Sequence, residues 1–384
     1  MAEVYFTVRR AIIKLEKGRA VVQTLNEQRG KQMPEQFTHR AICELRTRGQ
    51  VITDHFVSEV LSSNPLGDPA ERDLLVYLPP GYERSPNQRF PVVFALGGYS
   101  ESDASLQNWL PFQPTLSERL DLLTAQGVLG AGLIVVMPDC FTAYGGSQYL
   151  NSPAVGNYDD YLVQELAPYI DHTYRTLGGG RRGIFGKSSG GYGALRGGML
   201  HPDVWSAVAC HSGDLLFELC YASDFPAFCN IINRVGGLEA WYNAFLTRIQ
   251  KTEEDMTALD ILAMAACYSP DPELAPFPFR LPFDLQTCER LPHVWERWQA
   301  HDPVRMAEDL RIQEALRPLK LLYFDCGSRD QYQLHFGARL LARTLKRAGV
   351  PYEYEEFDDD HTNIAYRYNV SLPKLAQVLW EGAT

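Results

Sequence analysis

A serine with a glycine two residues away on each side is the feature of this sequence that most directly suggests chemistry. Residues Gly186 to Gly190 read G-K-S-S-G, after the apolar pair Ile184-Phe185 and before small residues compatible with a helix. In such a G-x-S-x-G pattern the serine occupies a tight turn between a strand and a helix, where glycines avoid collisions. The N-terminus of that helix directs free N–H groups toward a developing anion. The pattern predicts Ser188 as a nucleophile.

The same stretch has two other interpretations. The letters G-K-S suggest a phosphate-binding loop, but that motif needs a glycine five residues before the Gly of G-K-S. Position 181 is arginine, Gly180 comes one residue too early, and the apolar residues fall inside the supposed loop. The remaining alternative is a Gly/Ser-rich turn without chemistry. Whether Ser188 is a nucleophile therefore depends on whether the sequence also supplies a base and an acid for it.

Side chains that could activate the serine follow it in the order acid, then histidine. A serine nucleophile needs a base to accept its proton and a carboxylate to orient that base. The apolar run 320–324 leads to Asp325 and Asp330, and the run 352–357 is followed by three aspartates and His361. Loops that follow parallel strands meet at the carboxyl edge of a sheet, where ligands bind. We predict His361 as the base and Asp330 as the acid, with Asp325 as the alternative acid.

Backbone N–H groups are needed to stabilise the negative charge of an acyl-transfer intermediate. One donor is the N–H of Ser189, beside the nucleophile, and another should come from the loop after the strand that ends at Leu96. In that loop we predict Tyr99 N–H as the donor, with Gly98 as the reserve. Lys187 could add positive charge nearby, although a solvated surface lysine is the simpler interpretation.

Apolar runs predict the strands that must position these residues. Continuous runs are typical of strands buried on both faces of a sheet, and they lie at 90–96, 132–138, 206–210, 320–324 and 352–357. Alternating segments at 51–61 and 73–82 predict an antiparallel entry hairpin, and apolar spacing predicts a helix over 158–176. Strands and helices that alternate in this way form a mostly parallel, doubly wound α/β sheet. The loop after 132–138 supplies four candidates for lining a substrate cleft, with a plain surface loop as the alternative: Tyr144, Gln148, Tyr149 and Asn151.

Residues 213–303 interrupt this alternation. The stretch is rich in aromatic residues and contains the run P-F-P-F-R-L-P-F. Connections of this length are usually functional or carry their own structure. We predict a mainly helical cap inserted into the sheet domain, with an aromatic packing layer that has no ligand role as the alternative.

Charge is distributed unevenly over the 384 residues. The formal net charge is −11, although residues 1–50 carry ten Lys or Arg and only five Asp or Glu. The acidic remainder argues against nucleic acid as the main partner. We interpret residues 1–45 as a basic extension, with helical periodicity from Val8 to Leu15, and residues 46–384 as the main domain.

The cysteines and the hydropathy of the sequence indicate the cellular compartment in which we expect the protein. The eight cysteines form no C-x-x-C pair and no zinc-ligand spacing with histidine, and several lie in apolar runs. Buried free thiols indicate a reducing environment, so we expect a cytoplasmic protein without a metal. No apolar run approaches 18 residues, so no membrane span is expected.

Several motifs together resemble the putative-esterase family, which includes esterase D/S-formylglutathione hydrolase, feruloyl esterases and enterochelin esterases. The resemblance covers about residues 50–210 and 318–384, and it is carried by Gly97-Gly98-Tyr99, E-L-x-P-Y-I-D at 165–171, G-x-S-x-G-G-Y-G-A-L at 186–195, G-x-x-D at 327–330 and His361. It implies an α/β-hydrolase fold, and it implies the same roles for Ser188, Asp330, His361, Tyr99 and Ser189. The chain departs from the family at Gly97, where His, Asp or Ser is common, and in its larger 213–303 insertion.

These observations predict a serine esterase that hydrolyses a small-molecule carboxylic ester through an acyl-enzyme intermediate, without metal or cofactor. An acyltransferase would use the same three side chains and differ only in the acceptor of the acyl group. A non-catalytic binding module on the same fold is the third hypothesis.

Overall fold

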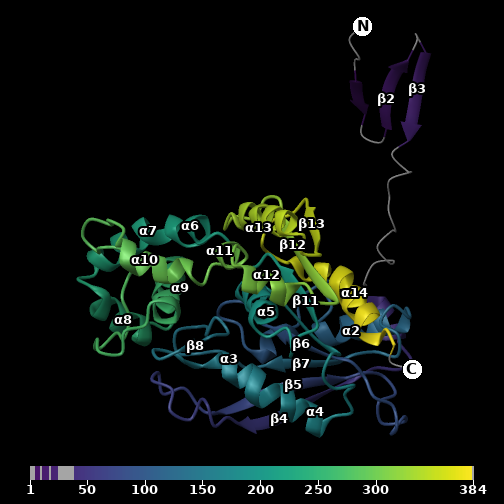
Figure 1. Ribbon diagram of the computed structural model, residues 1–384, viewed down its shortest axis with the longest axis horizontal. Helices are drawn as coiled ribbons and strands as arrows, with labels where there is room; N and C mark the ends of the chain where they lie inside the picture. The colour runs from purple at the N-terminus through teal and green to yellow at the C-terminus, as the bar shows by residue number, and fades with distance from the viewer. Residues whose placement is uncertain (1–4, 9–10, 17–18, 25–38, 383–384) are drawn as a thin grey trace.

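The computed structural model describes the backbone of residues 5–8, 11–16, 19–24 and 39–382 (Figure 1). Its centre is an eight-stranded sheet of order β13-β12-β11-β10-β6-β7-β5-β4. The strands are β4 (Gln50–Val57), β5 (Glu71–Leu78), β6 (Val92–Leu96), β7 (Ile134–Pro138), β10 (Arg182–Lys187), β11 (Ala207–His211), β12 (Leu321–Gly327) and β13 (Glu353–Phe357).

The predicted sheet is confirmed in its main features. Strands β6, β7 and β10 to β13 pair in parallel, and β4 and β5 form the antiparallel hairpin expected from the alternating segments. The expectation that 352–357 is buried on both faces is wrong, because β13 is the edge strand and its residues are partly or fully exposed.

Helices cover both faces of the sheet, since alternate residues of each strand face opposite ways. On one face Val93, Ala95, Val135 and Met137 pack with α2 (Leu116–Ala125) and α14 (Tyr368–Trp380). The other face packs against α4 (Ala167–Thr173), α5 (Ser189–Leu200) and α13 (Leu334–Ala348). Shorter elements complete this part: α1 (His39–Glu44), η2 (Asp103–Gln107), β8 (Asn151–Ser152), β9 (Gly156–Asn157), α3 (Tyr158–Asp160), the π-helical η3 (Tyr161–Leu166) and η5 (Ile364–Arg367).

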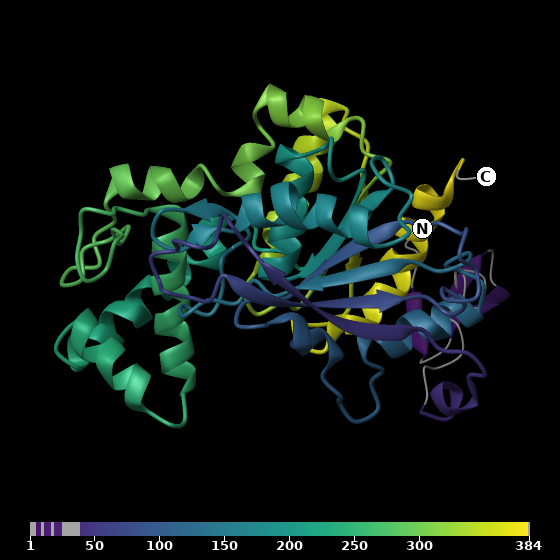
Figure 2. The ribbon, with the colours of Figure 1, turned by 90° about the horizontal axis from the view of Figure 1, so that it is seen from below.

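The chain between β11 and β12 forms the helical insertion, in agreement with the expected cap. Its helices are α6 (Phe217–Cys220), η4 (Ala222–Asp224), α7 (Phe225–Arg234), α8 (Leu238–Thr247), α9 (Glu253–Tyr268), α10 (Pro292–Gln299), α11 (Pro303–Met306) and α12 (Leu310–Leu316). Two orthogonal views show α7 to α10 standing beside the sheet (Figures 1 and 2). Aromatic rings form the interior of the insertion; Phe225, for example, packs edge-on against Trp295 and Trp298.

The helix expected from Val8 to Leu15 is wrong. Strands β1 (Tyr5–Val8), β2 (Ala11–Glu16) and β3 (Arg19–Thr24) form an antiparallel sheet instead. The β-branched residues of A-I-I-K-L-E and R-A-V-V-Q-T favour strands over helices. Residues 1–4, 9–10, 17–18 and 25–38 of the predicted extension lie outside the described residues, and its last part contains α1. None of the helices in the described part of the chain has the length and apolar character needed to cross a bilayer.

Candidate active site

Ser188 occupies the sharp turn between β10 and α5. Its backbone has φ 57° and ψ −128°, a conformation that costs free energy in a non-glycine residue. A Cβ on Gly186 would lie 2.5 Å from the carbonyl carbon of Gly190, and one on Gly190 would lie 2.2 Å from the oxygen of Leu96. The turn therefore requires both glycines. Because β10 runs directly into Ser188, the residues before it form a strand and not a phosphate-binding loop.

His361 contacts Asp330 and not the alternative acid. The Nδ1 of His361 lies 2.8 Å from an Asp330 carboxylate oxygen, and both side chains are buried. The other Asp330 oxygen accepts the backbone N–H of Tyr332 at 2.9 Å, which fixes the carboxylate in its loop. The loops after β12 and β13 can approach this closely because a Cβ on Gly327 would lie 2.5 Å from the oxygen of Asp359.

A cavity of about 710 Å³ brings the predicted nucleophile and base together. Ser188 and His361 both line it, as do Gly98, Tyr99 and Ser189. The rest of the lining comes mainly from the insertion and from the loop after β12 and includes Asp214, Tyr221, Asp224, Lys251, Thr252, Glu253, Met256, Thr257, Asp260 and Tyr332. Of the aromatic residues between 213 and 303, Tyr221 lines this cavity. Most of the other aromatic side chains of this segment pack against one another inside the insertion.

Two backbone N–H groups at this cavity lack an acceptor in the part of the chain that the structure describes. Among the described residues the N–H groups of Tyr99 and Ser189 have no hydrogen-bond partner, whereas Gly98 N–H donates to a Glu101 carboxylate oxygen at 2.6 Å. The reserve donor, Gly98, is therefore already occupied. The side chain of Tyr99 fixes the loop by donating its hydroxyl to the carbonyl of Tyr144 at 2.8 Å.

None of the four candidate cleft residues lines the cavity. Tyr144 is buried and packs edge-on against Tyr242, whereas Asn151 is exposed and accepts the backbone N–H of Asp160. Tyr149 donates its hydroxyl to the carbonyl of Gly97 at 2.6 Å, and the buried Gln148 donates to Asp214. Their observed contacts support the loops of the site.

Asp214, which the sequence analysis did not single out, connects three parts of the site. One carboxylate oxygen accepts the Ser189 hydroxyl at 2.8 Å, the Tyr221 hydroxyl at 2.8 Å and the Gln148 amide at 3.2 Å. Burial raises the pKa of Asp214, while these three donors oppose that effect. Its position three residues after a buried strand, at the same sheet edge as the other predicted residues, was the available signal.

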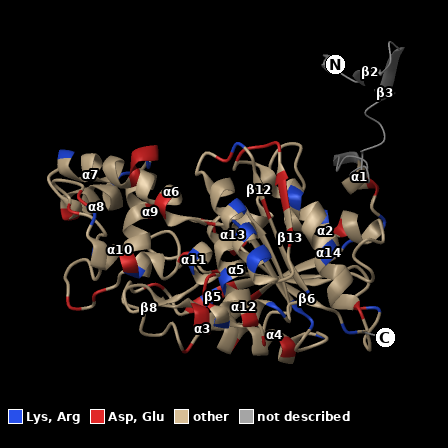
Figure 3. Cartoon of the chain, turned by 45° about the horizontal axis from the view of Figure 1, so that its top comes forward, with Lys and Arg blue, Asp and Glu red and all other residues tan. Residues whose placement is uncertain are grey.

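The inserted helices also bring unpartnered acids to the cavity. Asp224 and Asp260 are half-buried, and neither carboxylate has a hydrogen bond or an ion pair within the described residues. Burial raises the pKa of each, and for Asp260 the nearby Asp214 and Asp224 raise it further. Figure 3 shows acidic positions distributed along these helices. The part of the lining that the insertion contributes therefore carries more acidic than basic side chains.

Lys187 departs from the solvated surface lysine expected from the sequence. It is half-buried, and its ammonium group has no hydrogen bond or ion pair within the described part of the chain. Burial lowers its pKa, whereas Glu101, Asp330 and other nearby acids oppose that shift. No cluster of three or more His, Cys, Asp or Glu in the described residues could hold a metal ion.

Comparison with known proteins supplies the family. The family model described as "Putative esterase" matches residues 66–374. The chain belongs to the putative esterase family. The predicted resemblance is therefore confirmed, and the esterase is an enzyme that hydrolyses carboxylic esters.

Solved structures confirm the α/β-hydrolase fold of the esterase. A ferulic acid esterase matches with a TM-score of 0.55 and 21% identity over 86% of this chain and 99% of its own. An S-formylglutathione hydrolase from Agrobacterium tumefaciens gives 0.51 and 17%, over 86% of this chain and 96% of its own. A fluorophosphonate-binding serine hydrolase from Staphylococcus aureus gives 0.50 and 17%, over 86% and 99%. A sequence search of the curated proteins finds no match.

Proposed function

We propose that this esterase uses Ser188 as nucleophile, His361 as base and Asp330 as the carboxylate that orients the imidazole. Ser188 Oγ adds to the ester carbonyl carbon while His361 Nε2 takes the hydroxyl proton. The bond to the leaving group then breaks, and His361 returns that proton to the leaving oxygen. Water attacks the acyl-enzyme with His361 again as base, which releases the acid and restores the serine.

The N–H groups of Tyr99 and Ser189 hold the oxyanion in this mechanism. Both are free to donate, and a donor of this kind typically contributes about 3 kcal/mol to lowering the barrier. Asp214 positions Ser189 through its hydroxyl. No step needs a metal or a cofactor, and the substrate is a small-molecule ester.

The observation that carries this proposal is the hydrogen bond between His361 and Asp330 at a cavity that also contains the strained Ser188. A fluorophosphonate probe tests it, because such probes label activated serines. Wild-type protein should be labelled, and Ser188→Ala should not be. Equal labelling of the two proteins would refute Ser188 as the nucleophile.

We also propose that residues 46–384 form the catalytic unit and that residues 1–45 are an extension. The family match, which begins at residue 66, supports this division. A protein without residues 1–32 should keep its ester hydrolysis and its melting temperature. A large fall in either would contradict the proposal.

A reducing compartment, the cytoplasm, is the proposed location. Six of the eight free cysteines are buried thiols within the cores, which is how unmodified cysteines are commonly placed. Alkylation and mass spectrometry of protein taken from its native cells should find all eight as thiols. Native disulfides would overturn this assignment.

A further inference from the structure

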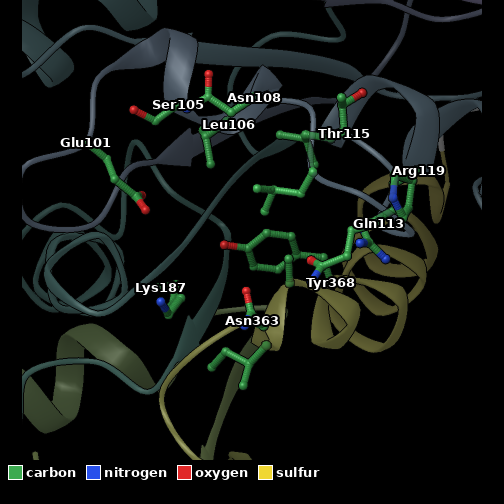
Figure 4. Close-up of a pocket in the computed structure, with 15 residues that line it drawn as sticks. Glu101, Ser105, Leu106, Asn108, Gln113, Thr115, Arg119, Lys187, Asn363 and Tyr368 are labelled. Atoms are coloured by element: carbon green, nitrogen blue, oxygen red, sulfur yellow. The ribbon is translucent and has the colours of Figure 1, made fainter.

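A second, smaller pocket adjoins the catalytic cavity (Figure 4). It has a volume of about 170 Å³, and it shares Glu101 and Lys187 with the larger cavity. Figure 4 shows these two residues on one side, the Tyr368 ring between, and Arg119 with Gln113 on the other side.

Several side chains that line this small pocket can donate hydrogen bonds. Tyr368 is only 6% exposed, and its hydroxyl, which points into the pocket, has no hydrogen-bond partner among the described residues. The half-buried ammonium of Lys187 also lacks a partner there, and the amides of Asn108, Gln113 and Asn363 line the same space.

The charges of the lining favour an anion. Lys187 and the buried Arg119 are cationic, and Arg119 donates to the neutral amide of Asn369 at 2.5 Å. Glu101 is the acidic side chain of the lining, and Gly98 N–H already occupies one of its oxygens. The larger cavity, by contrast, is lined by Asp214, Asp224, Glu253 and Asp260, with Lys251 as a cation among them. An anionic group on a substrate therefore meets fewer carboxylates in the small pocket than in the larger cavity.

The position of the pocket indicates which part of an ester would reach it. One wall is formed by Asn363, Ile364 and Ala365, which follow His361 in the chain. In the proposed mechanism His361 gives its proton to the leaving oxygen, so the leaving group lies on this side. The acyl group then extends toward the inserted helices.

We propose that the small pocket binds a carboxylate or phosphate group on the alcohol part of the ester, with Lys187 and Tyr368 as the residues that determine this specificity. The inference rests on the proposed function, since it takes the direction of the leaving group from the role of His361. It assigns the esterase to substrates whose alcohol part is anionic.

Matched acetate esters test this assignment. The carboxylate ester is 3-acetoxypropanoate, its neutral isostere is 3-acetoxypropanamide, and 2-acetoxyethyl phosphate is the phosphate arm. Wild-type kcat/KM should be at least about tenfold higher for an anionic ester than for the carboxamide, the size expected for one partly desolvated charge contact. A preference for either anion supports the proposal, and the larger one identifies the anion.

Two variants test which residues cause the preference for anionic esters. Lys187→Met should lower the ratio of anionic to neutral kcat/KM by about tenfold, and Tyr368→Phe, which removes a single hydroxyl, by about threefold. The matched control is Lys320→Met. It removes the same charge directly before the first residue of β12, at the edge of the sheet away from the pocket, and should leave the ratio unchanged. Because the ratio is internal to each protein, a partial loss of folded enzyme does not affect it.

The outcomes separate the two proposals. Ser188-dependent hydrolysis of all esters with the same ratio in wild type, Lys187→Met and Tyr368→Phe would overturn the anion pocket and leave the proposed function standing. Absence of Ser188-dependent hydrolysis with every ester would overturn the proposed function and this inference with it.

Discussion

Two buried aspartate–histidine pairs lie at or just beyond the carboxyl ends of the neighbouring strands β11, β12 and β13, and only one of them reaches a cavity. His361 Nδ1 is 2.8 Å from Asp330, and His211 Nδ1 is 2.8 Å from Asp325. The second pair even has a serine in place, because His211 Nε2 is 2.8 Å from the Ser371 hydroxyl. A complete Ser-His-Asp chain of hydrogen bonds is thus present in the interior.

The difference between the pairs is access and backbone strain. His211 and Ser371 have no exposed surface, and Ser371 lies within the regular helix α14. Ser188 lies on a strained turn beside free backbone donors, and it lines a cavity large enough for a substrate. Hydrogen-bond geometry alone therefore does not make an active site; the interior pair instead joins β11, β12 and α14.

The largest expected effect separates the two serines. Ser188→Ala should lower kcat by about 10⁶-fold, as the loss of a triad nucleophile does. Ser371→Ala should leave kcat of the folded protein within about twofold, because it touches no reacting atom. Steady-state hydrolysis of a p-nitrophenyl ester measures both, and a comparable loss in the two variants would contradict the assignment of roles.

The second largest effect is expected for Asp330, the acid of the pair at the cavity. Asp330→Asn keeps the shape of the side chain but removes the charge that orients the imidazole, and such a change in a serine triad costs about 10⁴-fold in kcat. The melting temperature should change by only a few degrees. An activity near that of wild type would transfer the orienting role to another acid.

Asp325→Asn should act on stability. Asp325 pairs with His211 and Arg367 in the interior, and breaking a buried pair typically costs about 3–5 kcal/mol. Burial alone would raise the pKa of Asp325, but His211 and Arg367 outweigh it and hold that pKa below its usual value.

The lowered pKa of Asp325 determines how its contribution to the free energy of unfolding depends on pH. The stabilisation by Asp325 is fully present above the unfolded pKa of about 3.9, declines below it, and is lost as the pH falls through the lower folded-state pKa. Urea unfolding at pH 7 and pH 3 should therefore show the wild type and Asp325→Asn converging in acid. A constant difference in unfolding free energy would exclude this origin.

Ser371→Ala should have the smallest effect. It leaves His211 Nε2 without its partner in the interior, and an unsatisfied buried group costs about 1–3 kcal/mol. Denaturant unfolding should show that loss while ester hydrolysis per folded molecule stays the same. A loss of activity in the folded protein would give the interior pair a role in catalysis.

Sequence reasoning predicted the sheet and the elbow because these follow local rules. Gly186, Ser188 and Gly190 are close in the chain, and Asp330 and His361 follow apolar runs that mark the strands. Asp214 follows a buried strand and could have been found by the same rule, whereas Asp260 could not, because an inserted helical segment has no fixed register with the sheet. The pairing of His211 with Asp325 depends on which strands are neighbours in the sheet, and the order of strands in a sheet cannot be read from the sequence.

The three hydrogen bonds to Asp214 have a practical consequence for engineering. This single carboxylate ties the start of α5, the loop around Gln148 and the beginning of the insertion at Tyr221 into one block. A chimera that exchanges the insertion for one from another protein should therefore be joined beyond Tyr221, so that the block is inherited whole. Grafts cut closer to β11 would detach a support of the nucleophile along with the segment they replace.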